Sequence, residues 1–335
     1  MKSEFSNKLK SAVQNQIPFV LFRKPDEKKV WMYVEDASDS HRFLMHSFDS
    51  KVEKSISDAN PIFLDLDEFD FEDELNLNSA PDTQPKTQSE YETLIRETIQ
   101  EIKKSEIRKI VISRRKEIKN TGFNLLRSYK NLLNLHPQAW VYLWHHPGQE
   151  TWMAATPELL LSQNGEEVKT VSLAGTRRPE VEWTEKEYDE QKIVTDFILE
   201  NFTGIQNLEV HGPETVQAGK FLHLKTFIAA QKAKDFDLKQ VLENLHPTPA
   251  VCGLPKMEAF EFILNKEGYD RAFYAGYLGI EKDEQKEYFV NLRCAQIFKD
   301  KIWIYVGGGI TADSDPEKEW LETELKSGTI LNGLA

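Results

Sequence analysis

The stretch that decides the fold class is FYAGYLGIEKDEQKEYFVNLRCAQIFKDKIWIYV, residues 273–306. It contains three runs of the β-branched and aromatic residues that suit strands, at 273–280, 287–298 and 301–306. The connections DEQK and KD between these runs are short and polar, as in hairpins. The sequence therefore predicts an antiparallel sheet near its C-terminal end.

A cluster of three glycines, Gly307, Gly308 and Gly309, follows the last of these strands. Without side chains, their backbone amides could approach an anion closely. The same three glycines could instead form a turn that packing alone requires. The cluster matches neither a dinucleotide fingerprint nor a Walker loop.

The chain ends with a predicted helix. Asp315 is placed as its N-cap and Pro316 as its first helical residue. At helical spacing, Glu319, Glu322 and Lys326 then lie close to one face.

The middle of the chain alternates between predicted strands and helices. Two capping boxes, Ser89 with Glu92 and Thr184 with Glu187, predict helices that carry apolar stripes. A further helix is expected over 220–233. The expected strands are KIVISRRKEI (109–118), AWVYLWHH (139–146), TWMAAT (151–156) and VKTVSLAG (168–175).

The first 85 residues have the pattern of a supporting layer. FVLFRK and KKVWMYV predict a hairpin, with Pro25 and Asp26 in the turn. Residues 76–88 are rich in Asn, Pro, Thr and Gln, as loops are. We expect a single domain over 1–335.

Composition restricts the function classes. A chain of 335 residues with 40% hydrophobic content can bury a large core. Its net charge of -13 argues against nucleic acid as a partner. Cys252 and Cys294 are too few for a disulfide framework, and no window is apolar enough for a membrane span. We expect a cytoplasmic protein without membrane contact.

Two pairs of glutamates are candidates for a metal site. Glu187 and Glu190 are three residues apart on one predicted helix, and Glu319 and Glu322 repeat this spacing on another. Four convergent carboxylates would suit Mg²⁺, a hard cation that prefers oxygen ligands. On an acidic protein, however, glutamates at this spacing are usually solvated, so spacing alone does not decide between the two interpretations.

Three other residues have unusual positions. Lys109 begins a strand and Glu158 follows Pro157. A buried lysine can serve as a base and a buried glutamate as an acid, because burial shifts their pKa values toward the neutral form. Both could equally lie in water at strand ends. His246, in LHPTPAVCG, is a candidate site residue or a hydrogen-bonded structural histidine.

Several segments together resemble the chorismate-utilising family, which includes isochorismate synthases, salicylate synthases, anthranilate synthase large subunits and aminodeoxychorismate synthases. The resemblance spans roughly residues 89–332 and covers eight segments in the family's order. They are KIVISR, ATPELLLS, VSLAGTRRP, EYDEQKIV, LHPTPAVCGLPK, FYAGYLG, VNLRCAQI and YVGGGITADSDPEKEWLETELK. The resemblance implies that 89–332 is the catalytic core and that 1–85 is a diverged N-terminal part.

The resemblance implies an α/β (α+β) fold, with antiparallel sheets packed face to face and helices outside. It implies chorismate as substrate and Mg²⁺ as cofactor, with Lys109 as the base that activates water and Glu158 as the acid. The metal ligands would be Glu190 and Glu322, supported through water by Glu187 and Glu319. The substrate-binding residues would be Gly175, His246, Tyr274, Arg293, Gly307, Gly308, Gly309 and Lys326.

Within the family, the chain resembles the isochorismate-forming type. Amine-using anthranilate synthases generally carry glutamine where this chain has Lys109, which favours water as the nucleophile. Ala174 stands where aminodeoxychorismate synthases typically place a lysine. We therefore expect no glutaminase subunit, and a monomer or weak homodimer. Salicylate synthase, which adds elimination of pyruvate, stays open, as does a silent domain that only binds Mg²⁺ and chorismate.

Overall fold

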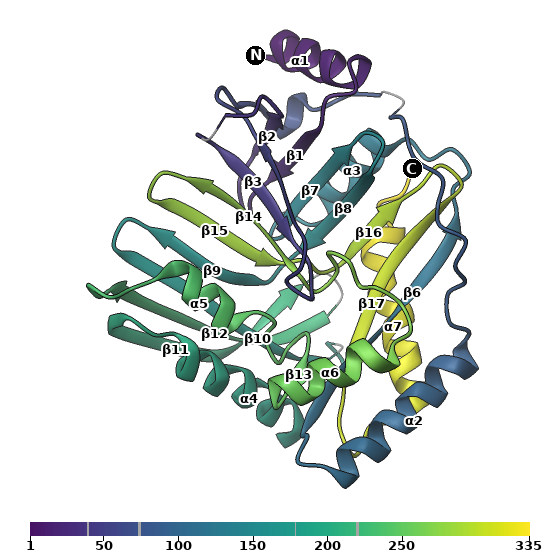
Figure 1. The fold of residues 1–335 in the computed structure, drawn as a ribbon, viewed down its shortest axis with the longest axis vertical. Coiled ribbons are helices and arrows are strands. Elements are labelled where there is room, and N and C mark those ends of the chain that lie inside the picture. The colour runs from purple at the N-terminus through teal and green to yellow at the C-terminus, as the bar shows by residue number, and fades with distance from the viewer. Residues whose placement is uncertain (39, 73–74, 178, 219–220) are drawn as a thin grey trace.

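The computed structural model describes residues 1–38, 40–72, 75–177, 179–218 and 221–335, which form two antiparallel sheets with helices around them (Figure 1). The first sheet has the strand order β13 (Gly253–Leu254), β6 (Lys109–Lys119), β17 (Lys301–Ile310), β16 (Cys294–Ile297), β8 (Glu150–Thr156), β7 (Trp140–His146), β1 (Phe19–Arg23), β2 (Lys29–Val34) and β5 (Ile62–Asp65). The second has the order β11 (Ile205–Ala218), β12 (Phe221–Lys232), β10 (Glu167–Arg177), β9 (Leu159–Asn164), β15 (Gln285–Val290), β14 (Tyr277–Lys282), β3 (Arg42–His46) and β4 (Glu53–Ser57).

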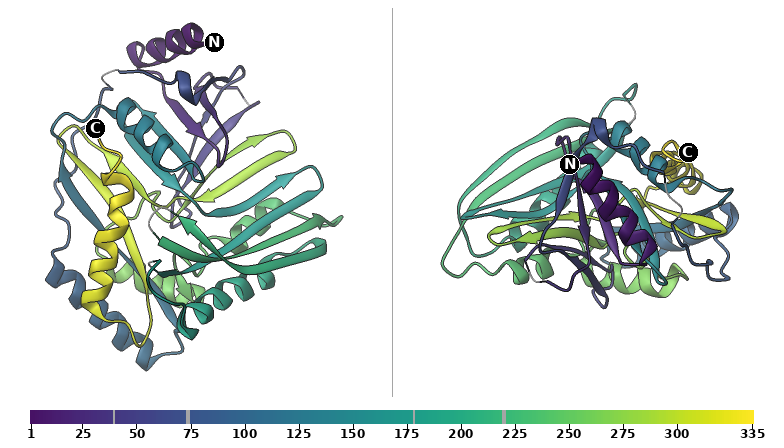
Figure 2. Two further views of the ribbon diagram at one scale, coloured as in Figure 1. Left: turned by 180° about the vertical axis from the view of Figure 1, so that it is seen from behind. Right: turned by 90° about the horizontal axis from the view of Figure 1, so that it is seen from above.

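The helices lie outside the two sheets. They are α1 (Lys2–Gln14), α2 (Gln88–Lys104), α3 (Leu125–Leu135), α4 (Glu185–Asn201), α5 (Leu238–Leu245), α6 (Lys256–Lys266) and α7 (Pro316–Leu331), with a short 3-10 helix at Leu66–Glu68. Helix α4 contacts β10 and β12, and α7 contacts β17 with α2 beside it (Figures 1 and 2). None of the described helices is long and apolar enough to cross a membrane.

Aromatic rings join the two sheets. Phe22 of the first sheet lies 5.4 Å from Phe43 of the second, measured between ring centroids. Trp140 of the first sheet lies 4.9 Å from Phe289 of the second. All four side chains are buried, and large aromatic rings contribute most to a core of this kind. The predicted face-to-face packing of antiparallel sheets is therefore confirmed.

The hairpin of β14 and β15 and the hairpin of β16 and β17 are both present. The expected strand at 287–298 is nevertheless two strands, β15 in the second sheet and β16 in the first. Between them, the buried Asn291 donates to the Phe273 carbonyl at 2.9 Å and accepts from the Tyr142 hydroxyl at 3.0 Å. Arg293 has a positive φ of 49°. This bend takes the chain from one sheet to the other.

The helix expected over 220–233 was a wrong prediction, because this segment forms β12. Each edge of β12 pairs with a strand, β10 on one side and β11 on the other. Leu224, Thr226, Ile228 and Ala230 are buried, which is the period of two that a strand requires. Residue 220 lies outside the described part of the chain. Alanine and glutamine in this run favour a helix locally, and pairing on both edges outweighs that preference.

The first predicted capping box is displaced by two residues. Helix α2 begins after Thr87, whose backbone N–H donates to the Glu90 carboxylate at 2.8 Å, so Ser89 lies inside the helix. Thr87 and Glu90 have the same spacing as Ser89 and Glu92, and the sequence pattern does not distinguish the two pairs. The second box is present, since the Thr184 N–H donates to Glu187 at 2.9 Å.

The N-terminal 85 residues contribute strands to both sheets. The predicted hairpin of β1 and β2 is present, and β1 also pairs with β7 in the first sheet. Strand β3 pairs with β14 in the second sheet. This part of the chain therefore completes the two sheets instead of forming a separate layer.

Candidate active site

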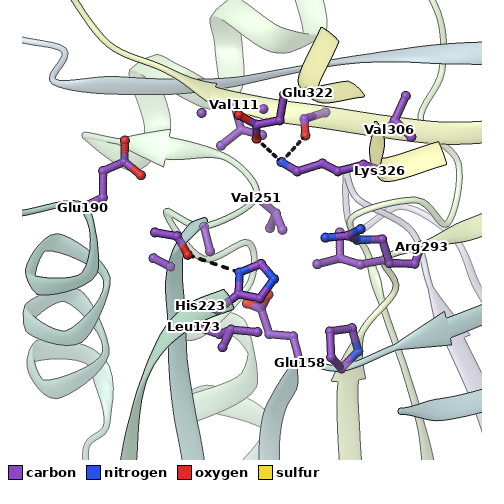
Figure 3. Close-up of a pocket in the computed structure, with 18 of the residues that line it drawn as sticks. Val111, Glu158, Leu173, Glu190, His223, Val251, Arg293, Val306, Glu322 and Lys326 are labelled. Carbon is purple, nitrogen blue, oxygen red and sulfur yellow. Dashed lines mark hydrogen bonds and ion pairs between the residues drawn. The ribbon is translucent and has the colours of Figure 1, made fainter. Parts of the chain in front are cut away.

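A cavity of about 230 Å³ lies where the ends of β6 and β17 approach β10 and β12, between α4 and α7 (Figure 3). All the residues predicted for the site line it except His246. The predicted residues that line it are Lys109, Glu158, Gly175, Glu187, Glu190, Tyr274, Arg293, Gly307, Gly308, Gly309, Glu319, Glu322 and Lys326. Positions more than 200 residues apart in the sequence thus meet at one place.

Lys109 is the first residue of β6 and is buried. Its side chain lies across the neighbouring strand, where a Cβ on Gly309 would be only 2.5 Å from the Lys109 Cε. A Cβ on Gly307 would similarly be 2.9 Å from the Tyr274 hydroxyl. Alternate glycines of β17 therefore leave the space that these two side chains occupy.

The glycine cluster belongs to β17 and is not a loop, contrary to its interpretation as a turn. Val111, opposite Gly309, donates its N–H to the Cys252 carbonyl on the far side of β6, at 2.7 Å. Gly309 is thus in a non-hydrogen-bonded pair, and its own N–H faces away from β6. Strand β16 pairs only with residues 302–304 of β17. Beyond that point, the edge of β17 presents backbone amides to the cavity.

Glu158 lies between β8 and β9 and is only 5% exposed. Burial raises the pKa of its carboxyl group to about 8, although the charges of Lys109 and Arg293 act in the opposite direction. At neutral pH, Glu158 is therefore mostly a neutral acid with a proton to donate. This is the environment that converts a glutamate into a general acid.

Arg293 reaches the cavity from the bend between the two sheets. Its side chain is partly buried, and its guanidinium donates from Nη1 to the Thr329 Oγ1 of α7 at 3.3 Å. Burial lowers the pKa of Arg293, and the nearby Tyr274, Glu322 and Glu158 act in the opposite direction. A partly buried guanidinium that lines a cavity suits bidentate pairing with a ligand carboxylate.

The four glutamates enter the cavity from two helices. Figure 3 shows Glu190 on α4 and Glu322 on α7 pointing into it. Glu322 pairs with the Lys326 Nζ at 2.5 Å, and Lys326 also donates to the Gly307 carbonyl at 2.9 Å. The Glu319 carboxylate accepts a hydrogen bond from Ser314, also at the C-terminal end of the chain, at 2.8 Å.

The donor set at these helices suits a hard cation. Among the described residues, no three His, Cys, Asp or Glu side chains form a ready metal site. Mg²⁺ does not need one, because it commonly uses one or two carboxylates and completes its shell with waters and substrate oxygens. Glu190 and Glu322 fit that requirement. Glu187 caps α4 and Glu319 bonds Ser314, which is consistent with a supporting role.

His223 lines the cavity and was not predicted from the sequence (Figure 3). Its Nδ1 lies 3.2 Å from the Gly175 carbonyl, which can only accept, so the ring proton is on Nδ1. Burial lowers the His223 pKa to about 3, helped by Arg293 and Lys326. The imidazole is therefore neutral. A correct strand assignment for β12 would have placed His223 on the face opposite the buried Leu224, Thr226 and Ile228.

His246 lies behind the cavity wall. Its Nε2 is 3.2 Å from the Phe48 carbonyl, and its ring is perpendicular to those of His46 and Tyr277. Burial lowers its pKa to about 3. The residues that line the cavity from this loop are Ala250 and Val251, and His246 is not among the lining residues.

Comparison with known proteins agrees with this geometry. The family model for chorismate binding enzymes matches residues 44–335. The chain belongs to this family. The match to this chorismate-binding family begins inside β3, earlier than the resemblance of the sequence segments suggested.

Named members of the chorismate-binding family are similar to this chain. An isochorismate synthase from Haemophilus influenzae is 29% identical over 257 residues, which are 71% of this chain and 59% of that protein. One from Bacillus subtilis is 32% identical over 202 residues, 56% of this chain and 51% of that protein. The chain thus covers less than two thirds of these relatives.

Solved structures of chorismate-binding enzymes have the same fold. A 2,3-dihydroxybenzoate-specific isochorismate synthase from Bacillus anthracis has a TM-score of 0.81 at 22% identity, covering 97% of this chain and 98% of that one. The menaquinone-specific isochorismate synthase from Escherichia coli has a TM-score of 0.79 at 20% identity, covering 95% and 89%. The predicted fold is therefore confirmed over nearly the whole chain.

Proposed function

We propose that this chain is an isochorismate synthase, which converts chorismate to isochorismate by adding water at C2 and removing the C4 hydroxyl. One observation carries the proposal: Lys109 and the protonated acid Glu158 line the same cavity. The names of the similar proteins support the same reaction.

The substrate's two carboxylates have separate partners in this proposal. The enolpyruvyl carboxylate lies against the Arg293 guanidinium, with Tyr274 and the amides at the edge of β17 beside it. The ring carboxylate lies at the α4 and α7 end, near Glu190 and Glu322. A bound Mg²⁺ at this end would supply positive charge that draws electron density from the ring. Holding both ends orients the ring between the acid and the base.

The chemical step then needs two proton transfers. Lys109 takes a proton from a water molecule, which adds at C2 while both ring double bonds shift. Glu158 gives its proton to the C4 hydroxyl, which leaves as water. One water is added and one is lost, so substrate and product have the same composition. Lys109 loses a proton and Glu158 regains one before the next cycle.

We also infer the setting of the reaction. Cys252 and Cys294 are both free and buried, which suits the reducing cytoplasm. Because Lys109 activates water, the proposed reaction needs no ammonia and hence no glutaminase subunit.

Product analysis tests the proposed function. Purified protein would be incubated with chorismate in Mg²⁺ or in EDTA, and the products separated by liquid chromatography and identified by NMR. We expect isochorismate in equilibrium with chorismate, and only with metal. Salicylate and pyruvate would show that elimination follows. Unchanged chorismate, where a control isochorismate synthase reacts, would contradict the proposal and leave a silent binding domain.

A further inference from the structure

We propose that Arg114, which lies outside the cavity, is a positioning residue that fixes the rotation of α7 and thereby the placement of its carboxylates. This inference rests on the proposed metal role of Glu322 and Glu319. Arg114 is on β6, five residues after Lys109. An odd separation along a strand puts the two side chains on opposite faces of the sheet.

The side chain of Arg114 is only 2% exposed and makes three contacts with α7. Its Nε donates to the Thr323 Oγ1 at 2.8 Å. Its guanidinium carbon lies 3.6 Å from the centroid of the Trp320 ring, and its Nη2 pairs with the Glu324 carboxylate. A planar guanidinium that stacks and donates in fixed directions restrains rotation as well as distance.

These contacts are completed from two other elements. Tyr91 of α2 lies near both groups, with its ring centroid 5.8 Å from the Arg114 guanidinium carbon and 5.8 Å from the centroid of the Trp320 ring. Its hydroxyl donates to the Ile112 carbonyl of β6 at 3.3 Å. Lys116, next on the same face of β6, pairs with Glu324 at 2.5 Å. Strand β6, α2 and α7 are thus joined at one buried cation.

The residues that Arg114 holds adjoin those that face the cavity. Trp320 and Thr323 directly follow Glu319 and Glu322 in the sequence, and each residue step turns a helix by about 100°. Side chains extend roughly 5–6 Å from a helix axis, so a roll of about 10° would move a carboxylate by about 1 Å. Mg²⁺ tolerates little deviation from its octahedral distances, and orientation strongly affects catalysis.

The contacts of α7 on the cavity side are of a different kind. Glu322 pairs with Lys326 of the same helix, and Lys326 also donates to the Gly307 carbonyl of β17 at 2.9 Å. The lysine ammonium lies at the end of a flexible stem, so this contact restrains rotation of the helix less than a planar guanidinium does. A Cβ on Gly308 would lie 2.9 Å from the Glu319 Oε2, so β17 leaves room for the carboxylate there. Arg114 supplies the more directed restraint, from β6.

The test compares Arg114→Met and Arg114→Lys with wild type by titration with Mn²⁺, detected by electron paramagnetic resonance, without and with saturating chorismate. We expect Arg114→Met to weaken Mn²⁺ binding at least tenfold and Arg114→Lys to recover part of the loss. The Michaelis constant for chorismate at saturating metal should stay within about twofold. Lys116→Met is the matched control, since it removes a partner of Glu324 without touching Trp320 or Thr323.

Thr323→Val is a milder variant that removes only the hydroxyl, and we expect about a threefold loss of Mn²⁺ affinity. This variant replaces Arg114→Met in the test if Arg114→Met does not fold, which a thermal melt would show.

Two results would overturn the inference while leaving the proposed reaction intact. One is wild-type Mn²⁺ affinity in a folded Arg114→Met protein, and the other is wild-type Mn²⁺ affinity in Thr323→Val if Arg114→Met is unfolded. Mn²⁺ binding that depends on Arg114 in a protein that leaves chorismate unchanged would overturn only the reaction. Absence of wild-type Mn²⁺ binding with and without chorismate would overturn the positioning role.

Discussion

The two ends of the cavity place glutamate side chains in different environments. At one end, Glu158 is buried and its pKa is raised to about 8, which keeps the proton. At the other end, Glu322 pairs with Lys326 and Glu319 accepts from Ser314. The same type of side chain is a proton donor in one place and a candidate cation ligand in the other. Surroundings, more than residue type, assign the chemistry.

The largest effect is expected at the first end. Glu158→Gln keeps the shape but has no proton to transfer, so turnover should fall by roughly 10³–10⁴-fold. Mn²⁺ binding should not change, since Glu158 belongs to neither helix. Wild-type kcat/KM should decline above about pH 8, where Glu158 loses its proton. Full turnover by Glu158→Gln would break the distinction between the two ends.

The next effect is expected at the second end. Glu322→Gln and Glu190→Gln should each lower turnover by roughly 10²–10³-fold, because each removes a charge from the cation site. Both should raise the Mg²⁺ concentration needed for half-maximal rate, which a metal titration measures. Glu317→Gln, an exposed position on the same helix, is the control. If both variants need the same Mg²⁺ concentration as wild type, the assignment of the metal site to α4 and α7 is wrong.

The free energy of unfolding should depend on pH because the pKa of Glu158 is raised in the folded protein. An unfolded glutamate ionises near 4.5 and the folded Glu158 near 8, so between these values only the folded state holds the proton. Stability contributed by this group is therefore lost as pH rises through that window. Glu158→Gln has no such loss, and by pH 9 it should be more stable than wild type by roughly 4 kcal/mol. Denaturant titrations at pH 5 and pH 9 measure it, and a pH-independent difference would contradict the raised pKa.

The smallest effect is expected between the two ends, where Thr329 orients Arg293. Thr329→Val removes an acceptor worth about 1 kcal/mol, so the KM for chorismate should rise roughly three- to fivefold. Turnover at saturation should hardly change. Thr329→Ser keeps the hydroxyl and should behave as wild type. Equal KM values for all three proteins would show that Arg293 is oriented without α7.

Local patterns predicted most of the fold. The hairpins, β6 to β8, β10, and α2, α4 and α7 follow from alternation, stripes and caps. Residues 221–232 were misassigned because β11, the strand directly before them, was not predicted, and their other pairing partner, β10, lies much earlier in the sequence. With that strand, His223 was also missed. Local propensity could not supply information that only the sheet contains.

The candidate site was predicted through family segments, and spacing alone did not decide it. Spacing could not separate Glu319 and Glu322 from ordinary solvated glutamates, because their role depends on a cavity that other elements form. The bend at Arg293 gave no local signal, since residues 287–298 have the composition of one strand. The support from Arg114 depends on a contact between β6 and α7, which are about 200 residues apart.

The N-terminal strands have a consequence for shortening this protein. Strand β1 covers an edge of β7, and β3 covers an edge of β14. A chain trimmed to its recognisable family segments, 89–332, would expose both edges at once, each apolar and ready to pair with another chain. Such a fragment would keep every residue of the cavity and still be prone to aggregation. The N-terminal strands therefore cover two sheet edges that would otherwise be open to pairing between chains.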